Sequence, residues 1–428
     1  MFNKETVRDI DLEGKTVLLR ADYNVPLQDG RIADDYRIQQ SLPTVQYILE
    51  RASKLIICSH LGRPTGPGDS SSSLFPVAKR LTHLLDQPVE FATDCVGTVA
   101  SKAVDGLPKG GVLLLENLRF HPEEKANDDE FAKQLASLAD VFVQDGFGVV
   151  HRADASTDAI TKYIPSVAGL LLEKEVETIT KVMENPERPL MAIVGGAKIA
   201  DKLDILNKLI VIADVVAIGG AMANTFLAAK GYNVGDSLYD KDQINVAKHV
   251  LKTAEMESAK RRFVFSLPHD VVVAQKIDKA APTRIVELNT HTMADIQHYP
   301  KRVPAESSQI HAHEKILDLG PFSASFIAGA VQLSNTVLWN GTLGVTETES
   351  LQGPIGPTAH ATQTLTEALL GELGHKPYTV VGGGDTVGYL ETRKLLHSFD
   401  FVSTGGGASL ELMSGHSLPG VDALRDKK

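Results

Sequence analysis

The chain has 428 residues, of which 43% are hydrophobic and 23% are charged. This is the composition of a folded protein, and the length exceeds one ordinary hydrophobic core, so we expect two domains. A formal net charge of −11 argues against a nucleic-acid-binding protein and against one that binds an acidic membrane surface. The two cysteines, Cys58 and Cys95, provide neither a disulfide framework nor the spacing of a metal site.

The N-terminal residues lack the apolar core of a signal peptide, and no apolar run approaches the length of a membrane span. We therefore expect a cytoplasmic protein without a membrane partner.

Apolar runs of strand length alternate with helical segments along the whole chain, which predicts parallel strands joined by crossover helices. The fold class is therefore α/β. In such sheets ligands bind beyond the carboxyl ends of the strands, so the residues that follow each run are the informative ones.

In the first half of the chain, basic residues follow the apolar runs. The residues are Arg20, then His60 and Arg63, then Arg119, and finally His151 and Arg152. Arg37 is predicted separately, in a loop or at the start of a helix. A single arginine is more often a solvated surface residue than a ligand contact, but four strand ends bearing arginine in an acidic protein favour a small, multiply anionic substrate.

The segment 192–202 predicts a strand, a glycine turn and the start of a helix. Lys198 and Lys202 are four residues apart, which would place them on one face of the first helical turns. The glycine pair and the helix start favour a phosphate ligand. The alternative is an ordinary strand-to-helix turn with two solvated lysines.

Glycines follow the later apolar runs of the second half. They occur in Gly219-Gly220, Asn340-Gly341, Gly382-Gly383-Gly384-Asp385-Thr386 and Ser403-Thr404-Gly405-Gly406-Gly407. Such clusters suit a polyphosphate and the flat face of a base, and Asp385 is the type of oxygen ligand that Mg²⁺ prefers. Each cluster by itself is also compatible with an ordinary turn of an α/β protein.

Between the two halves, residues 166–186 predict a linking helix. Ser166 is a suitable N-cap, an apolar stripe follows, and Pro186 ends the segment. This interpretation places a first domain at 1–165 and a second domain at 187–403.

These residues, taken together, resemble the phosphoglycerate kinase family from end to end. The matching stretches come in the order of the family, and they are Arg20-Ala21-Asp22-Tyr23-Asn24-Val25-Pro26, Ser59-His60-Leu61-Gly62-Arg63-Pro64, Glu116-Asn117-Leu118-Arg119-Phe120, Phe147-Gly148 with His151-Arg152, Gly195-Gly196-Ala197-Lys198, Trp339-Asn340-Gly341, Gly382-Gly383-Gly384-Asp385-Thr386 and Ser403-Thr404-Gly405-Gly406-Gly407-Ala408-Ser409-Leu410-Glu411.

The resemblance implies two Rossmann-like parallel-sheet domains, a bilobed arrangement joined by a hinge helix, with residues 404–428 returning to the first domain. It also implies reversible, direct in-line phosphoryl transfer from 1,3-bisphosphoglycerate to ADP, giving 3-phosphoglycerate and ATP in glycolysis, with Mg²⁺ and on domain closure. We further expect a monomer that binds no nucleic acid.

The family pattern also assigns roles to individual residues. The glycerate would be held by Asp22, Asn24, Arg37, His60, Arg63, Arg119 and Arg152. Arg37 and Lys198 would face the transferred group across the cleft. The nucleotide would be held by Lys202, Gly219, Gly220, Asn340, Gly382, Gly383, Gly384 and Thr386, its ribose by Glu347, and the metal by Asp385.

The chain departs from the family pattern at a few positions, although none removes a charged group. Thr342 stands where proline is usual and Thr346 where an aromatic residue is common. Both lie in the segment expected to line the nucleoside pocket, so nucleotide affinity and preference are the properties that these departures would change.

Two other functions fit the sequence less well. A nucleotide-linked dehydrogenase would need Gly-x-Gly-x-x-Gly after the first strand of a βαβ unit, and that pattern is not in place. A hinged binding protein without chemistry would explain an arginine-lined cleft, but it would leave Lys198 and Asp385 without a role.

Overall fold

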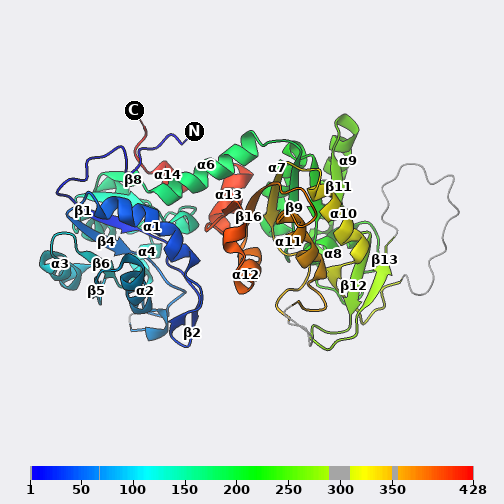
Figure 1. The fold of residues 1–428 in the computed structure, drawn as a ribbon, viewed down its shortest axis with the longest axis horizontal. Helices are drawn as coiled ribbons and strands as arrows, with labels where there is room; N and C mark the ends of the chain where they lie inside the picture. Colours follow the sequence, from blue (N-terminus) through cyan, green and yellow to red (C-terminus); the bar gives the residue numbers. More distant parts are fainter. Residues whose placement is uncertain (1, 67, 289–308, 349–354, 428) are drawn as a thin grey trace. The chain divides into compact units, whose positions relative to one another are not determined.

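The computed structural model describes residues 2–66, 68–288, 309–348 and 355–427. The chain divides into two compact units, unit 1 with Met1–Thr180 and Thr404–Lys428, and unit 2 with Lys181–Ser403. Each unit contains its own six-stranded parallel sheet (Figure 1). Within the described ranges, none of the helices combines the length and the apolar character that crossing a bilayer requires.

Unit 1 is built on a sheet with the strand order β5-β6-β4-β1-β7-β8. The strands of unit 1 are β1 (Thr16–Arg20), β2 (Leu27–Gln28), β3 (Arg31–Ile32), β4 (Lys54–Cys58), β5 (Val89–Ala92), β6 (Val112–Leu115), β7 (Val141–Gln144) and β8 (Ser166–Ala168). Its helices are α1 (Tyr36–Leu49), α2 (Phe75–Leu85), α3 (Gly97–Gly106), α4 (Pro122–Lys125), α5 (Asp129–Ala136), α13 (Gly407–Ser414) and α14 (Pro419–Asp422), and its short 3₁₀ turns are η1 (Ser70–Ser72), η2 (Leu118–Phe120), η3 (Phe147–Val149) and η4 (Ala159–Lys162).

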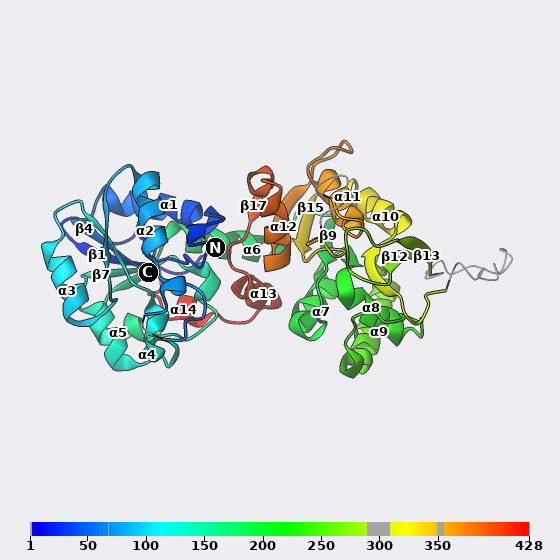
Figure 2. The ribbon, with the colours of Figure 1, turned by 90° about the horizontal axis from the view of Figure 1, so that it is seen from below.

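Alternation along each strand divides the core of unit 1 into two layers. Val17 and Leu19 of β1 pack in one apolar cluster with residues of α1 and α2. Leu18, between them, packs in another with residues of α3 and α5. Figure 2 shows α1 on one side of the strands and α4 and α5 on the other. A sheet covered on both faces explains why its strands are almost continuously apolar.

The last residues of the chain belong to unit 1. Lys4 forms an antiparallel bridge with Asp426, and its Nζ donates to the carbonyl oxygens of Asp422 and Leu424 at 2.9 and 3.1 Å. The segment around Lys4 and the segment 422–426 therefore lie side by side in unit 1. Gly405 packs against Phe147 so closely that a Cβ there would overlap the ring. This glycine of the 403–407 cluster thus serves chain packing in unit 1.

The segment after Pro165 differs from the expected helix at 166–186. Ser166 lies in β8, which pairs with β7, and the helix α6 runs from Leu170 to Glu184. Ser166 is therefore not an N-cap, because its backbone completes the edge of the unit 1 sheet. Gly169 follows the strand, and its N–H donates to the carbonyl of Gln144 at 2.8 Å.

Unit 2 has a parallel sheet with the strand order β11-β10-β9-β15-β16-β17. The strands of unit 2 are β9 (Leu190–Val194), β10 (Val215–Ile218), β11 (Val264–Ser266), β12 (Asp270–Ala274), β13 (Arg284–Glu287), β14 (Lys315–Leu319), β15 (Thr336–Asn340), β16 (Tyr378–Gly382) and β17 (Phe401–Val402). Its helices are α7 (Leu203–Ile212), α8 (Gly220–Ala229), α9 (Ile244–Lys260), α10 (Pro321–Val331), α11 (His360–Leu369) and α12 (Gly384–Thr392), and its short 3₁₀ turns are η5 (Ala200–Lys202), η6 (Lys241–Gln243) and η8 (Leu396–Ser398).

Unit 2 also contains an antiparallel sheet, β13-β12-β14, that the sequence analysis did not predict. Val271 and Val273 of β12 face a small apolar core with Val286 of β13, whereas Ile285 is half exposed. Such half-covered strands give a weaker sequence signal than the buried parallel ones. The sheet matters for function because β14 forms one wall of the cavity described below.

Candidate functional site

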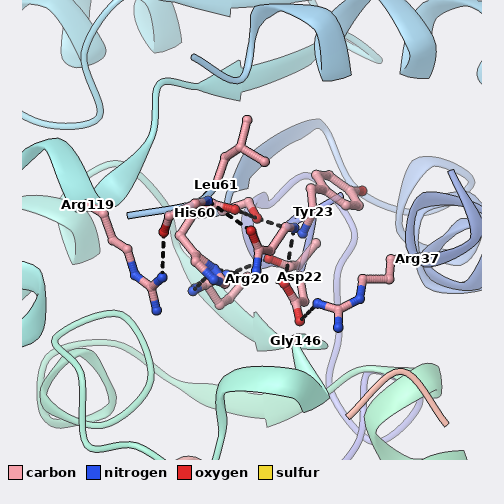
Figure 3. A network of polar contacts seen from close by, with 12 residues as sticks. Arg20, Asp22, Tyr23, Arg37, His60, Leu61, Arg119 and Gly146 are labelled. Carbon is pink, nitrogen blue, oxygen red and sulfur yellow. Dashed lines mark hydrogen bonds and ion pairs between the residues drawn. The ribbon is translucent and has the colours of Figure 1, made fainter. Parts of the chain in front are cut away.

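The basic residues predicted in the first half of the chain come together at one edge of the unit 1 sheet. Four neighbouring strands, in the order β6-β4-β1-β7, run parallel and end at this edge. Arg119 follows β6, His60 follows β4 and Asp22 follows β1. Figure 3 shows Arg119 and Arg37 on either side of Asp22, His60 and Arg20.

Asp22 is the anion of this cluster and holds Arg37 in place. Arg37, in the first turn of α1, donates from a guanidinium nitrogen to Asp22 Oδ2 at 2.6 Å. His60 Nδ1 lies 3.9 Å from Asp22 Oδ1. Burial on its own raises the pKa of Asp22, but the charges of Arg37, His60 and Arg20 outweigh it and keep the pKa below its usual value. Asp22 is therefore ionised at neutral pH and orients the arginine.

His60 and Arg119 both experience an excess of positive charge. Burial lowers the pKa of His60 well below its usual value, and the charges of Arg20, Arg119 and Arg37 lower it further, although Asp22 opposes the shift. Burial likewise lowers the pKa of Arg119, and the nearby charges of Arg152 and Arg20 add to the effect. Arginines that disfavour one another's charge in this way form, beside the neutral His60, a site that gains stability when a multiply charged anion binds.

The loop that carries Arg63 is tied to the same cluster. The N–H of Gly62 donates to Asn24 Oδ1 at 2.8 Å, and the carbonyl of Gly62 accepts from Arg119 at 2.8 Å. Arg63 itself is exposed. Arg152 is exposed too, and its Nε donates to His151 Nε2 at 3.1 Å. Both side chains therefore have free access to a dissolved ligand.

Arg20 differs from the other strand-end cations, because it is 1% exposed. Its Nε donates to Ser156 Oγ at 2.8 Å, and a terminal nitrogen approaches His60 Nδ1 at 3.3 Å. Ser156 Oγ in turn donates to the buried carboxyl of Glu124 at 2.5 Å. Arg20 thus contacts His60 from the buried interior of the unit and does not face the solvent-accessible edge.

Asn117 is a positioning residue that the sequence analysis did not single out. It caps η2 by accepting from the N–H of Arg119 at 3.0 Å, and its Nδ2 donates to Leu61 O and Ser72 O. It therefore connects the loops that bear His60, Arg63 and Arg119. In the sequence, only its position between β6 and Arg119 pointed to a role in the site. Its contacts with Leu61 and Ser72 could not be predicted, because those residues are distant in the chain.

Unit 2 contains a cavity of about 310 Å³ at the edge where its strands end. Gly220, Glu347 and Asp385, three of the predicted nucleotide residues, line it. Apolar side chains, among them Leu343 and Val345, cover much of the wall. Thr342 lines the cavity, as the sequence analysis expected for the nucleoside pocket, whereas Thr346 is not one of its lining residues. A mainly apolar pocket with carboxylates at its margins suits a base and a ribose.

The glycines at three strand ends of unit 2 pack against one another. A Cβ on Gly220, which has φ +62°, would lie 2.6 Å from the backbone nitrogen of Gly196, and one on Gly341 would overlap Gly195. The N–H of Gly219 donates to Val194 O at 2.9 Å and that of Gly220 to Leu343 O at 3.0 Å. These two N–H groups are occupied within the protein, so they are not donors to a phosphate in this structure.

The start of α12 has a different arrangement. Gly383 precedes the helix with φ +91°, and Gly384 and Asp385 of the first turn are exposed. The first N–H groups of a helix have no partner within it, so this terminus offers donors to an anion. Thr386 is buried, and its Oγ1 accepts from the N–H of Gly341 at 2.7 Å, which fixes the helix to β15. Gly382 is the last residue of β16.

Lys198 and Lys202 do not share a helical face, contrary to the expectation from their spacing. Lys198 is exposed in the loop before η5, whereas Lys202 is at the end of η5 and points back to the glycine turn. Its Nζ donates to Gly195 O at 2.7 Å and to Asn340 Oδ1 at 2.6 Å. Burial lowers the pKa of Lys202 to about 8, although Asp385 and Asp201 oppose the shift. The loop breaks the helical register on which the spacing argument depended.

The chain matches the family model described as phosphoglycerate kinase over residues 7–416. A phosphoglycerate kinase of Moorella thermoacetica is 43% identical over 424 residues, covering 99% of this chain and 100% of the relative. One of Pelotomaculum thermopropionicum is 45% identical with the same coverage. The solved phosphoglycerate kinase of Coxiella burnetii superposes with a TM-score of 0.79 at 33% identity, over 98% of both chains.

Proposed function

The chain belongs to the phosphoglycerate kinase family, and from that premise we propose how its two sites divide the reaction of the family. It is a phosphotransferase of glycolysis that transfers a phosphoryl group reversibly between 1,3-bisphosphoglycerate and ADP, giving 3-phosphoglycerate and ATP. Phosphoryl transfer requires positioning and charge stabilisation more than covalent catalysis by the protein.

The phosphoglycerate is assigned to unit 1. The observation that carries this assignment is the group of cations around Arg119, where burial and the charges of Arg152 and Arg20 lower the pKa of that residue. The exposed Arg63 and Arg152 are available for the phosphate, and Arg37, oriented by Asp22, is available for the carboxyl end. Asn24 and His60 complete the set of residues assigned to the phosphoglycerate. Asn24 contributes by holding the loop that carries Arg63.

The nucleotide is assigned to unit 2, with the base in the apolar cavity and the ribose at Glu347. Gly220 lines the cavity and Gly219 precedes it directly after β10, while the N-terminus of α12, after Gly382 and Gly383, offers N–H donors to the phosphates. Lys202 and Asn340 lie at the neighbouring strand end.

Asp385 is suited to hold Mg²⁺ together with the nucleotide phosphates. Its carboxylate is exposed, lies in the first turn of α12 and borders the cavity. Mg²⁺ in kinases is commonly bound by one or two carboxylates and the phosphates of the substrate, and it neutralises charge on the phosphoryl group. One available carboxylate beside the cavity fits this donor set.

Lys198 and Arg37 would stabilise the transferred group. Because the two ligands are assigned to different units, the reaction requires a closed state in which the units bring them together for direct in-line transfer. Exclusion of water in that state protects the acyl phosphate from hydrolysis. The cytoplasmic location and the monomeric state remain predictions from the sequence.

Steady-state kinetics of Arg63→Ala and Glu347→Gln tests the division of labour. Removing Arg63 deletes a charge-assisted contact and should raise the KM for 3-phosphoglycerate about 10- to 100-fold with little effect on the KM for ATP. Glu347→Gln should raise the KM for ATP and leave the KM for 3-phosphoglycerate unchanged. The matched control is Arg51→Ala, which removes a surface arginine of unit 1 that pairs with Glu50. A rise in both KM values for either site variant would contradict the assignment.

A further inference from the structure

Three metal-ligating side chains meet in unit 1 outside the sites described above. Asp94 and Cys95 follow β5, and His121 follows β6 and η2. The two strands are paired, with Ala92 opposite Leu115, so the segments that leave them lie side by side. A carboxylate oxygen of Asp94, Sγ of Cys95 and a ring nitrogen of His121 all lie within 4.8 Å of one another.

The contacts of these residues arrange them as one group. His121 Nε2 lies 2.7 Å from Asp94 Oδ1, and the N–H of Cys95 donates to the same oxygen at 2.7 Å. The imidazole also packs on Phe131, with a distance of 5.3 Å between ring centroids. The orientation of the ring is therefore set by both a polar and an apolar neighbour.

The group is open to solvent on one side. The side chains of His121 and Asp94 are 26% and 39% exposed, whereas Cys95 is 1% exposed. A cation can reach the imidazole and the carboxylate from outside and meet the thiol at the base of the group.

We propose that Asp94, Cys95 and His121 form a binding site for a borderline-soft divalent cation, with Zn²⁺ as the best fit. One thiolate, one imidazole and one carboxylate are the donors that Zn²⁺ takes, at about 2.0–2.3 Å each, with a fourth position left for water. Tetrahedral coordination at these lengths needs donor atoms roughly 3–4 Å apart, so the three side chains need only small movements.

Binding of Zn²⁺ at this site would release a proton. Burial raises the pKa of the Cys95 thiol well above its usual value, so the thiol is protonated without a metal. Formation of the zinc–sulfur bond therefore releases one proton to solvent. The site is chemically distinct from the Mg²⁺ position proposed in unit 2, since Mg²⁺ prefers oxygen ligands and Zn²⁺ accepts sulfur and nitrogen.

Cobalt(II) titration of the full-length protein, in excess Mg²⁺ and under reducing conditions, tests the proposal, because cobalt bound to a thiolate gives a charge-transfer absorption. The wild type should show this absorption with one equivalent of Co²⁺, and Zn²⁺ should abolish it by displacement. Cys95→Ser should lack the absorption, and Cys58→Ser, the matched cysteine control, should retain it.

Two histidine variants decide whether the metal is at this site. His121→Gln should weaken Zn²⁺ binding, measured by calorimetry, at least about tenfold, since even changes next to a metal ligand cost 10- to 100-fold. His313→Gln alters the stacked pair His311–His313 in unit 2 and should change nothing. Kinase turnover without zinc verifies that each variant is folded. The proposal is overturned if the wild type gives no thiolate absorption, if Cys95→Ser retains it, or if His313→Gln removes it.

Discussion

The two candidate sites lie at the carboxyl ends of parallel strands in their own units, yet they are built in opposite ways. In unit 1 the strand ends carry side chains with charge, and Asp22, Asn117 and the carbonyl of Gly62 orient them. In unit 2 the strand ends carry glycines whose backbones contact one another and leave an apolar cavity. A side-chain site and a backbone site should therefore respond differently to mutation and to pH.

The largest effect is expected where chemistry depends on a single exposed charge. Lys198→Ala should lower kcat about 100- to 1,000-fold with little change in either KM, because a charge that acts on the transition state contributes on this scale. The measurement is steady-state kinetics in both reaction directions. Lys208→Ala, on the neighbouring helix α7, is the control. An unchanged kcat for Lys198→Ala would remove this lysine from its proposed role.

The glycine packing of unit 2 should be sensitive to a single methyl group. Gly220→Ala combines a left-handed φ of +62° with overlap against Gly196, so we expect it to lower the free energy of unfolding of unit 2 by about 2–4 kcal/mol. Trp339 fluorescence during denaturant unfolding measures it, since this buried residue is the only tryptophan of the sequence.

Gly231→Ala, after the other end of α8, is the matched control for that substitution. Its φ is +87°, but its Cβ would meet open space, so only the backbone strain of about 1–2 kcal/mol is expected. Equal losses for the two variants would show that the strand-end contacts in unit 2 are not tightly packed.

Because of Lys202, nucleotide binding to unit 2 should weaken at alkaline pH. The pKa of Lys202, about 8 in the free protein, rises when an anionic phosphate binds nearby, so ADP binding at pH 8 should take up a fraction of a proton. Above pH 8 the affinity should fall by up to about tenfold per pH unit. Calorimetry in buffers of different ionisation enthalpy measures the uptake. Lys202→Met should abolish it, and a proton uptake that persists in this variant would assign it to another group.

Because of His60, the stability of unit 1 should fall at acid pH. The pKa of His60 is far below 6.5 in the folded protein, so only the unfolded chain takes up this proton as the pH falls below about 6.5. Stability should therefore be lost toward acid pH, by at most about 1.4 kcal/mol per pH unit. Hydrogen exchange of β1 amides at pH 5 and pH 7 measures the loss, and His60→Asn should flatten it. The same slope in wild type and variant would exclude His60 as its source.

The first site could be predicted from the sequence more completely than the second. Charged residues such as Arg119 and His60 follow short, buried apolar strands, and parallel strands present their carboxyl ends at one edge, so the pattern alone brings them together. The pattern did not separate the buried Arg20 from the exposed Arg63, because burial depends on Ser156 and Glu124, which come from distant parts of the chain.

In unit 2 the same reasoning selected glycine loops that the structure brings together at one edge of the sheet, but it did not predict their contacts. Gly219 and Gly220 were expected to donate to a ligand, but their N–H groups bond to Val194 and Leu343. Lys202 was placed beside Lys198 by helical spacing, and the loop before η5 turned it toward Asn340 instead. A glycine that binds a ligand and a glycine that packs on another loop look identical in a sequence.

The amino-acid sequence by itself determined the α/β class, the strands that end in charge or in glycine, and the family to which the chain belongs, because all three depend on local pattern and order along the chain. Tertiary structure alone decided which cations face solvent, which N–H groups stay free, and that Cys95 meets His121, since these depend on contacts between residues far apart in the chain.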